Sequence, residues 1–232
     1  MPIIAKLKYV KYYAAILLQN WKKERESYAQ HGEDLLVESL LGRVNSFIDI
    51  GANDGVLFSN TYKFAKAGAR GLCFEPSVPT YRKLRLNHLF HPKVKCIRKA
   101  VSNSIGSVSF IEKGYESTLS YIGTNQSDSV PQTVEATTMS RILNQNHKFR
   151  NIDLLSVDVE GHEEEVFSSF DETPFQARVM IVETDKADSK KILDLPVFRD
   201  HKPKFYNGIN LILLHHTEKI QITDIPPNFK TY

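Results

Sequence analysis

The sequence has little cysteine, and this scarcity excludes two classes of protein. Only two of the 232 residues are cysteines, too few for a disulfide framework or a typical structural zinc site. Cys73 and Cys96 both lie in apolar, strand-like runs, where a small hydrophobic side chain is suited to the core. We interpret both as reduced thiols of a cytoplasmic protein.

A strong excess of one charge is also lacking. Lys and Arg number 30 against 27 Asp and Glu, a net charge of +3, and no dense basic cluster is present. The sequence therefore gives no sign of a nucleic-acid partner. No linker, internal repeat or low-complexity tract divides the chain either, and its length predicts one main domain with a substantial core.

The first 26 residues contain no uninterrupted hydrophobic run. Apolar residues recur there at alternating spacings of four and three, the pattern of one helix face: Ile3, Leu7, Val10, Ala14, Leu17 and Trp21. Lysines between them argue against a transmembrane span or a secretory signal. We expect residues 1–26 to form an amphipathic helical extension of a domain over residues 27–232. The helix would dock on its own domain, on a second subunit in a homo-oligomer, or at a membrane surface as a peripheral contact.

From Arg43 onward, short β-branched runs alternate with helical patterns, which predicts an α/β fold with a mostly parallel sheet and helices on both faces. Strands are expected at 46–51, 70–75, 93–98, 151–159, 178–185 and 210–215. Helices are expected at about 57–67, 78–90, 139–144 and 163–170. The runs 107–111 and 133–137 interrupt this alternation and predict an inserted β-hairpin, whose polar loop 112–132 is long enough for a functional lid.

The most informative run extends from Phe47 to Gly55 and joins a buried strand to a glycine turn. A loop that binds pyrophosphate presents backbone N–H groups and avoids carboxylates, and its glycines follow the spacing G-x-G-x-x-G. This turn has acids and a different glycine spacing, so it favours a cationic ligand, S-adenosyl-L-methionine, over a nicotinamide dinucleotide. Its candidate cofactor-binding residues are Asp49, Gly51, Ala52, Asn53, Asp54 and Gly55.

Acidic residues also follow three later strands, at the edge where parallel α/β sheets bind ligands. Glu75, followed by Pro76, closes the second strand, and its carboxylate can accept hydrogen bonds from both hydroxyls of a ribose. It would serve a nicotinamide dinucleotide equally well, so the glycine turn decides between the two cofactors. The remaining acids are Asp158, Glu160, Glu183 and Asp185.

Three motifs together resemble the FkbM-type S-adenosylmethionine-dependent methyltransferases. They are the run 47–55, the Phe-Glu-Pro turn at 74–76 and the run Ser-Val-Asp-Val-Glu-Gly-His-Glu at 156–163. The runs 28–37 and 134–139 are similar to further elements of that family. One departure is Met139-Ser140, where the family often has Leu-Asp.

The resemblance implies a Rossmann-like class I methyltransferase fold with a mostly parallel, seven-stranded sheet. It also implies that Asp49, Gly51 and Asn53 line the methionine end of the cofactor, that Glu75 holds the ribose and that Asp158 faces the methyl-transfer centre. Gln30 belongs to the upstream motif and is taken as a further cofactor contact. Members O-methylate sugars, polysaccharides and polyketides, so we expect an O-methyltransferase acting on a sugar, glycan or glycolipid-like hydroxyl.

A hydroxyl acceptor must lose a proton, and three residues are candidate bases: Asp158, Glu160 and His162. The acids Asp158, Glu160, Glu183 and Asp185 are also hard ligands suited to Mg²⁺, although we favour a metal-free site. Three other functions stay open: O-methylation of a small secondary metabolite, a nicotinamide-dependent oxidoreduction, and cofactor binding without catalysis.

Overall fold

The computed structural model describes residues 24–112, 120–122, 132–171, 173–184, 189–219 and 225–232. Three sequence predictions lie wholly or largely outside these ranges: the helix within residues 1–26, most of the loop 112–132, and Asp185. None of the helices in the described ranges is both long enough and apolar enough to cross a membrane.

An eight-stranded sheet runs through the domain in the order β12-β10-β11-β9-β8-β1-β2-β3. Its strands are β1 Ser46–Ile50, β2 Arg70–Phe74, β3 Val94–Ile97, β8 Asn151–Val157, β9 Gln176–Glu183, β10 His201–Tyr206, β11 Asn210–His215 and β12 Lys230–Thr231. The five strands from β9 to β3 in this order are parallel, whereas β11, β10 and β12 pair antiparallel. The predicted α/β fold with a mostly parallel sheet is confirmed, with eight strands among the described residues in place of the predicted seven.

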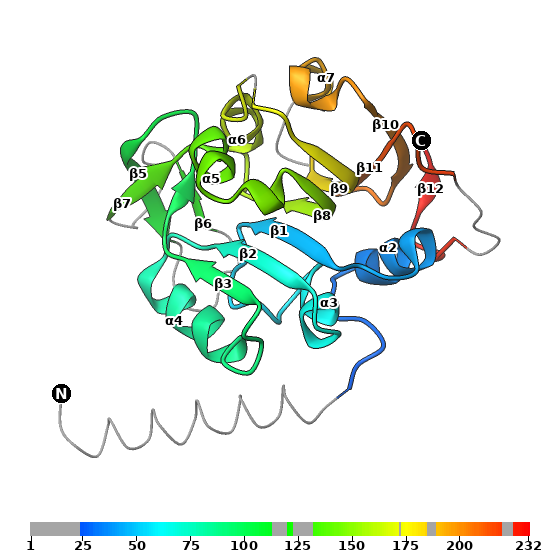
Figure 1. Ribbon diagram of the computed structural model, residues 1–232, viewed down its shortest axis with the longest axis horizontal. Coiled ribbons are helices and arrows are strands. Elements are labelled where there is room, and N and C mark those ends of the chain that lie inside the picture. The colour runs from blue at the N-terminus through cyan, green and yellow to red at the C-terminus, as the bar shows by residue number, and fades with distance from the viewer. Residues whose placement is uncertain (1–23, 113–119, 123–131, 172, 185–188, 220–224) are drawn as a thin grey trace.

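Helices cover both faces of this sheet (Figure 1). One face carries α2 Glu33–Leu41, α3 Tyr62–Lys66 and α4 Val78–Asn87, and the other carries α5 Met139–Gln145, α6 Glu163–Ser168 and α7 Ser189–Leu193. Alternation along β1 supplies both cores, because Phe47 packs on the first face and Ile48 and Ile50 on the second. A strand buried on both sides is held rigidly, so its carboxyl end is a firm platform for a site.

A second, four-stranded sheet flanks the main one. The predicted hairpin is confirmed as β5 Gly106–Glu112 paired antiparallel with β7 Gln132–Thr137. Two short strands that the sequence did not predict complete the sheet, β4 Ala100–Val101 and β6 Ser120–Ile122. The insertion thus stands beside the carboxyl ends of β1 and β2 (Figure 1).

One predicted helix was too long, and a strand of the main sheet was missed. The helix expected over 57–67 is α3 alone, because residues 57–61 form a turn in which Phe58 has a left-handed φ of 57°. Strand β10 was not predicted, because its sequence His-Lys-Pro-Lys-Phe-Tyr has lysines and a proline in place of an apolar run. It tolerates Pro203 through an irregularity in its pairing with β11, near the sheet edge.

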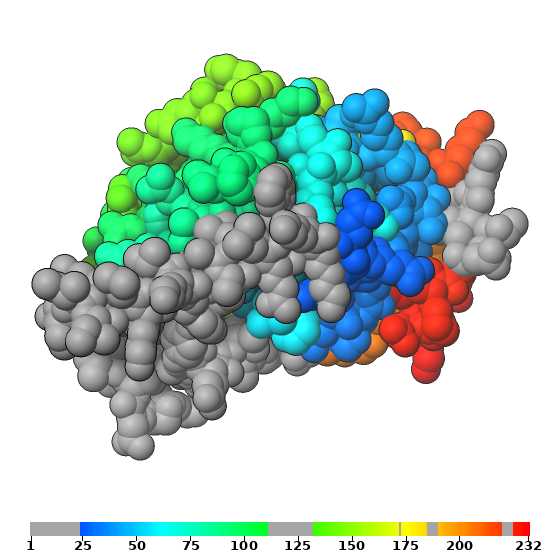
Figure 2. All heavy atoms as spheres, turned by 90° about the horizontal axis from the view of Figure 1, so that it is seen from below, coloured from blue at the N-terminus to red at the C-terminus, as the bar shows by residue number. Residues whose placement is uncertain are grey.

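Strand order reverses beside β1: the chain continues to β2 on one side, and β8 pairs on the other. Ligands of open α/β sheets bind at such a point, outside the carboxyl ends of the strands. The C-terminal residues lie next to the first described segment (Figure 2), where Asn228 Nδ2 donates a 3.2 Å hydrogen bond to the carbonyl of His31. This contact joins the C-terminal segment to the residues just before α2.

Candidate functional site

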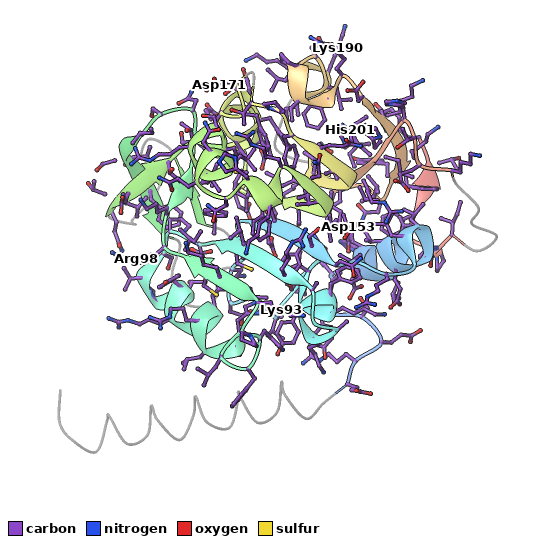
Figure 3. All side chains as sticks on the ribbon, in the orientation of Figure 1. Lys93, Arg98, Asp153, Asp171, Lys190 and His201 are labelled. Atoms are coloured by element: carbon purple, nitrogen blue, oxygen red, sulfur yellow. The ribbon has the colours of Figure 1, made fainter. Side chains whose placement is uncertain are left out.

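A pocket of about 270 Å³ opens at the carboxyl ends of β1, β2, β8 and β9, where the strand order reverses. Ten of the residues predicted from the sequence line it: Gln30, Asp49, Gly51, Ala52, Asn53, Glu75, Pro76, Asp158, Glu160 and Glu183. They come from segments as far apart as Gln30 and Glu183, and the parallel register of the strands brings the strand-end residues together. Asp153 lies at the opposite, amino end of β8 (Figure 3), away from the pocket.

Gly51 allows the chain after β1 to approach the chain after β8 closely. Its φ is +84°, and a Cβ built there would stand 1.7 Å from the carbonyl oxygen of Asp158. The amide of Asp158 in turn donates a 3.0 Å hydrogen bond to the carbonyl of Ile50. Only glycine permits this approach, which places the Asp158 backbone directly against the glycine turn.

Asp49 is one of the buried acids of the site, with 4% of its surface exposed. Its Oδ2 accepts a 2.6 Å hydrogen bond from the hydroxyl of Thr61, just before α3. Burial raises the pKa of Asp49 to about 7; the Thr61 hydrogen bond opposes that shift and the charge of Asp158 adds to it. A cation bound nearby would lower the pKa of Asp49 again and favour its ionised carboxylate.

Glu75 follows β2 and is largely buried. Its Oε1 accepts a 2.8 Å hydrogen bond from the amide of Ser77, and the Ser77 hydroxyl accepts one from the amide of Thr80 to cap α4. The cap and the strand end together fix the carboxylate at the pocket wall. A carboxylate fixed in this way can accept hydrogen bonds from two neighbouring hydroxyl groups.

Three carboxylates meet on the side of β8 and β9. Asp158, Glu160 and Glu183 each have an oxygen within 4.8 Å of the other two. Glu160 has a left-handed φ of 58°, rare for a residue with a long side chain, so this turn is strained. Such a cluster could hold an organic cation or a Mg²⁺ ion; Asp185, the fourth predicted ligand, lies outside the described residues.

Three predicted residues do not line the pocket. Asp54 accepts 2.8 Å hydrogen bonds from the amides of Val56 and Leu57, so it shapes the turn. A Cβ on Gly55 would stand 2.6 Å from Leu84 and 2.9 Å from His88, which indicates that glycine is needed there for packing against α4.

His162 also lies outside the pocket lining. Its Nε2 is 2.9 Å from the hydroxyl of Ser102, and its Nδ1 is 3.3 Å from a carboxylate oxygen of Glu165. Burial lowers the pKa of His162, and Glu165 opposes that shift. The position of His162 outside the pocket lining argues against a role as the general base.

Sequence reasoning missed several residues that line the pocket or hold its walls. Glu33 is fully buried and accepts 2.7 Å hydrogen bonds from the side-chain amides of Asn207 and Asn210, which join α2 to β11. Asn60 donates a 3.1 Å hydrogen bond to Ser156 on β8. The polar run Ser-Asn-Thr at 59–61 was the available signal, since such residues precede helices; it was absorbed into a predicted helix.

The residues present suit S-adenosyl-L-methionine. Its ammonium and sulfonium groups are cationic, and the carboxylates of Asp49, Asp158, Glu160 and Glu183 line one side of the pocket. Its ribose offers two hydroxyls, and the capped Glu75 can receive them. The left-handed Gly51 lets the Asp158 backbone lie against the glycine turn, and both residues line the pocket.

Comparison with known proteins agrees with this chemistry. The family described as "Methyltransferase FkbM domain" has a model that matches residues 49–205, more than half of the chain. No curated protein matches significantly.

Several solved structures are similar to this chain at low sequence identity. A methyltransferase from Geobacter sulfurreducens has 11% identity and a TM-score of 0.45 over 89% of this chain and 88% of that one. An O-methyltransferase from Bacillus cereus, in complex with SAH, has 11% identity and a TM-score of 0.45 over 92% and 91%. Cofactor-bound Rv0187 from MTB has 10% identity and a TM-score of 0.48 over 88% and 89%.

The family match covers the glycine turn, Glu75 and the acids after β8 and β9, which contribute most of the charged lining of the pocket. It excludes the nicotinamide-dependent oxidoreductase. The chain belongs to the FkbM methyltransferase family, and its cofactor is S-adenosyl-L-methionine.

Proposed function

We propose that this protein methylates a hydroxyl group of a sugar, glycan or glycolipid-like acceptor. The observation that supports the proposal is the position of Asp158 and Glu160, two carboxylates that share one pocket with the candidate cofactor residues. An alcohol must release its proton as its oxygen is methylated, and a carboxylate in the pocket can accept that proton.

Each wall of the pocket has its own part in this proposal. Asp49 and Glu183 would face the cationic end of the cofactor, and Glu75 would accept hydrogen bonds from the ribose. When bound, S-adenosylmethionine supplies an electrophilic methyl carbon, whose bond to sulfur breaks as its bond to the acceptor oxygen forms. The main work of the protein is then to place the hydroxyl in line and to keep water away.

Asp158 is the stronger candidate for the base because its position is the more firmly fixed. Its amide donates to Ile50 and its carbonyl packs on Gly51, so its Cα has little freedom. Glu160 has a longer side chain on the strained turn that follows. Since His162 lies outside the pocket lining, the two carboxylates are the bases to test first.

The test is transfer of a labelled methyl group to a panel of acceptors: free sugars, alkyl glycosides, small secondary alcohols and amines. We expect the label in methyl ethers of the sugars or glycosides. Label on the small alcohols alone would favour the secondary-metabolite alternative. Transfer only to nitrogen would overturn the O-methylation proposal.

Variants of the two acids sharpen this test. Asp158→Asn keeps the size of the side chain and removes the carboxylate, so turnover should fall by roughly 10²-fold or more if Asp158 is the base. Glu160→Gln asks the same question of the second acid. Asp171→Asn is the matched control, because Asp171 also has a left-handed backbone, with φ 49°, but lies away from the pocket near α6 (Figure 3).

A further inference from the structure

We propose that Leu57 and Phe58 form the acceptor-binding lip of the pocket and that they select acceptors with an alkyl or aryl group attached beside the reacting sugar. This inference rests on the proposed function and names the part of the acceptor that the described residues recognise. The natural substrate class would then be a glycoside or glycolipid rather than a free sugar.

The lip is apolar and open to solvent. Leu57 is 44% exposed and Phe58 46% exposed, and both line the pocket. Water contact at two adjacent large apolar side chains is unfavourable, at about 25 cal/mol for each Å² of apolar surface. A ligand that covers both side chains recovers that free energy, so an apolar group at this end of the pocket increases affinity.

Phe58 has a strained backbone conformation that the surrounding structure must hold in place. Its φ is 57°, a left-handed conformation that is a genuine outlier for a bulky residue. In the described part of the chain four non-glycine residues have such a backbone, and three of them line this one pocket: Asn53, Phe58 and Glu160. Strain of this kind is retained where a binding site requires it.

Hydrogen bonds on both sides hold the lip in place. Before it, Asp54 Oδ1 accepts 2.8 Å hydrogen bonds from the amides of Val56 and Leu57. After it, the Ser59 hydroxyl accepts a 3.0 Å hydrogen bond from the amide of Tyr62, and Asn60 is bound to β8. The two side chains are therefore presented on an ordered turn, which lowers the entropy lost on binding.

The charged residues of the pocket explain why the lip suits the acceptor. Asp49, Asp158, Glu160 and Glu183 provide for a cation, and Glu75 provides for a ribose. The lip has neither charge nor a polar side-chain atom, so it matches neither of these parts of the cofactor. Its exposure makes it accessible to a molecule that enters from solvent after the cofactor has bound.

The experiment is calorimetric binding of hexyl and methyl glycosides of several common sugars to the full chain with adenosylhomocysteine present. The two ligands differ only in apolar length. We expect the hexyl compound of at least one sugar to bind about fivefold or more tightly, since several methylene groups leave water. Equal affinities in every pair, or no binding of any hexyl glycoside, would overturn the proposal.

Variants of the two lip residues test whether they cause the preference for hexyl glycosides. Phe58→Ala and Leu57→Ala should remove most of the hexyl preference, and Phe58→Leu should retain part of it. Phe90→Ala is the matched control, because Phe90 is 55% exposed but does not line the pocket. Melting temperatures check that each variant is folded.

Two further outcomes separate this inference from the proposed function. If Phe58→Ala weakens adenosylhomocysteine binding as much as hexyl-glycoside binding, Phe58 is a cofactor wall and the inference is wrong. If the hexyl preference is found but no glycoside accepts a methyl group, the lip is confirmed and the proposed O-methylation fails.

Discussion

The hydroxyl of Thr61 donates a 2.6 Å hydrogen bond to the buried carboxylate of Asp49, and this bond joins the start of α3 to the end of the central strand β1. Asp49 has its pKa raised to about 7, mainly by burial. The pair therefore links the stability of the domain and the affinity of its cofactor to pH near neutrality.

The first prediction concerns stability without cofactor. The folded protein keeps a proton on Asp49 up to about pH 7, whereas the unfolded chain loses it near its ordinary value of 3.8. The unfolded state thus binds fewer protons in this interval, and stability falls as pH rises from about 4 to 7, then levels off. Asp49→Asn lacks this titration, so its stability relative to the wild type should rise over the same interval, by an amount on the order of 4 kcal/mol.

Urea unfolding of both proteins at several pH values checks this difference. Asp34 and Glu163 also have pKa values raised by burial, but they are common to both proteins, and their effects cancel. If the two curves of unfolding free energy against pH run parallel, Asp49 does not titrate in this range.

The second prediction concerns Thr61. Its hydrogen bond opposes the rise in the pKa of Asp49, so Thr61→Val, which has nearly the same shape, should raise that pKa further. The ionised carboxylate is the form that binds the ammonium of adenosylhomocysteine. We therefore expect affinity to fall by roughly three- to tenfold at pH 7 and to recover at pH 8.5 or above.

Calorimetry at the two pH values measures this shift, and Thr61→Ser, which keeps the hydroxyl, serves as the control. A loss of affinity that is the same at both pH values would indicate that Thr61 only supports the turn.

The third prediction compares two glycines with similar backbones. Gly51 has φ +84° and Gly68 has φ +89°, but a Cβ at Gly51 would stand 1.7 Å from the Asp158 carbonyl, whereas nothing lies within 4 Å of one at Gly68. Gly68→Ala should lower the unfolding free energy by about 1–2 kcal/mol, the cost of the left-handed conformation alone. Gly51→Ala must also part β1 from β8, so its loss should exceed about 4 kcal/mol. Equal losses in urea unfolding would show that the strand ends separate easily.

The sequence predicted the parts of this site that follow continuous hydrophobic strands. Run 47–55 has an apolar strand, a glycine turn and acids within nine residues, so strand, turn and ligand chemistry could all be inferred locally. Asp158 and Glu160 could be inferred in the same way, because they follow the apolar strand β8. Their closeness to Asp49 depends on the pairing of β1 with β8, about a hundred residues apart, which was expected from the fold and not from any local signal.

Other parts depended on geometry that a local pattern does not contain. His162 follows the Asp-Val-Glu-Gly turn in sequence, but consecutive left-handed residues at Glu160 and Gly161 redirect the chain before it. Strand β10 has lysines and a proline where an apolar run is expected, and pairing with the apolar β11 makes it a strand.

The last prediction concerns the strain at Phe58 and needs no acceptor. Phe58→Gly would remove the steric cost that a phenylalanine bears at a φ of 57°, on the order of 1–2 kcal/mol. Phe58 is 46% exposed, so its removal also loses part of its packing, and the greater entropy of an unfolded glycine opposes the gain. Phe58→Asn separates these effects, because asparagine tolerates the left-handed region and does not loosen the unfolded chain as glycine does. We expect the unfolding free energy of Phe58→Asn to equal that of the wild type or to exceed it by up to about 1 kcal/mol.

Phe90→Asn is the control, because Phe90 is exposed and has an ordinary backbone, and it should give no such gain. A loss of more than about 1 kcal/mol in Phe58→Asn would mean that the aromatic ring stabilises the fold itself, and the strain at this position would then have a structural explanation.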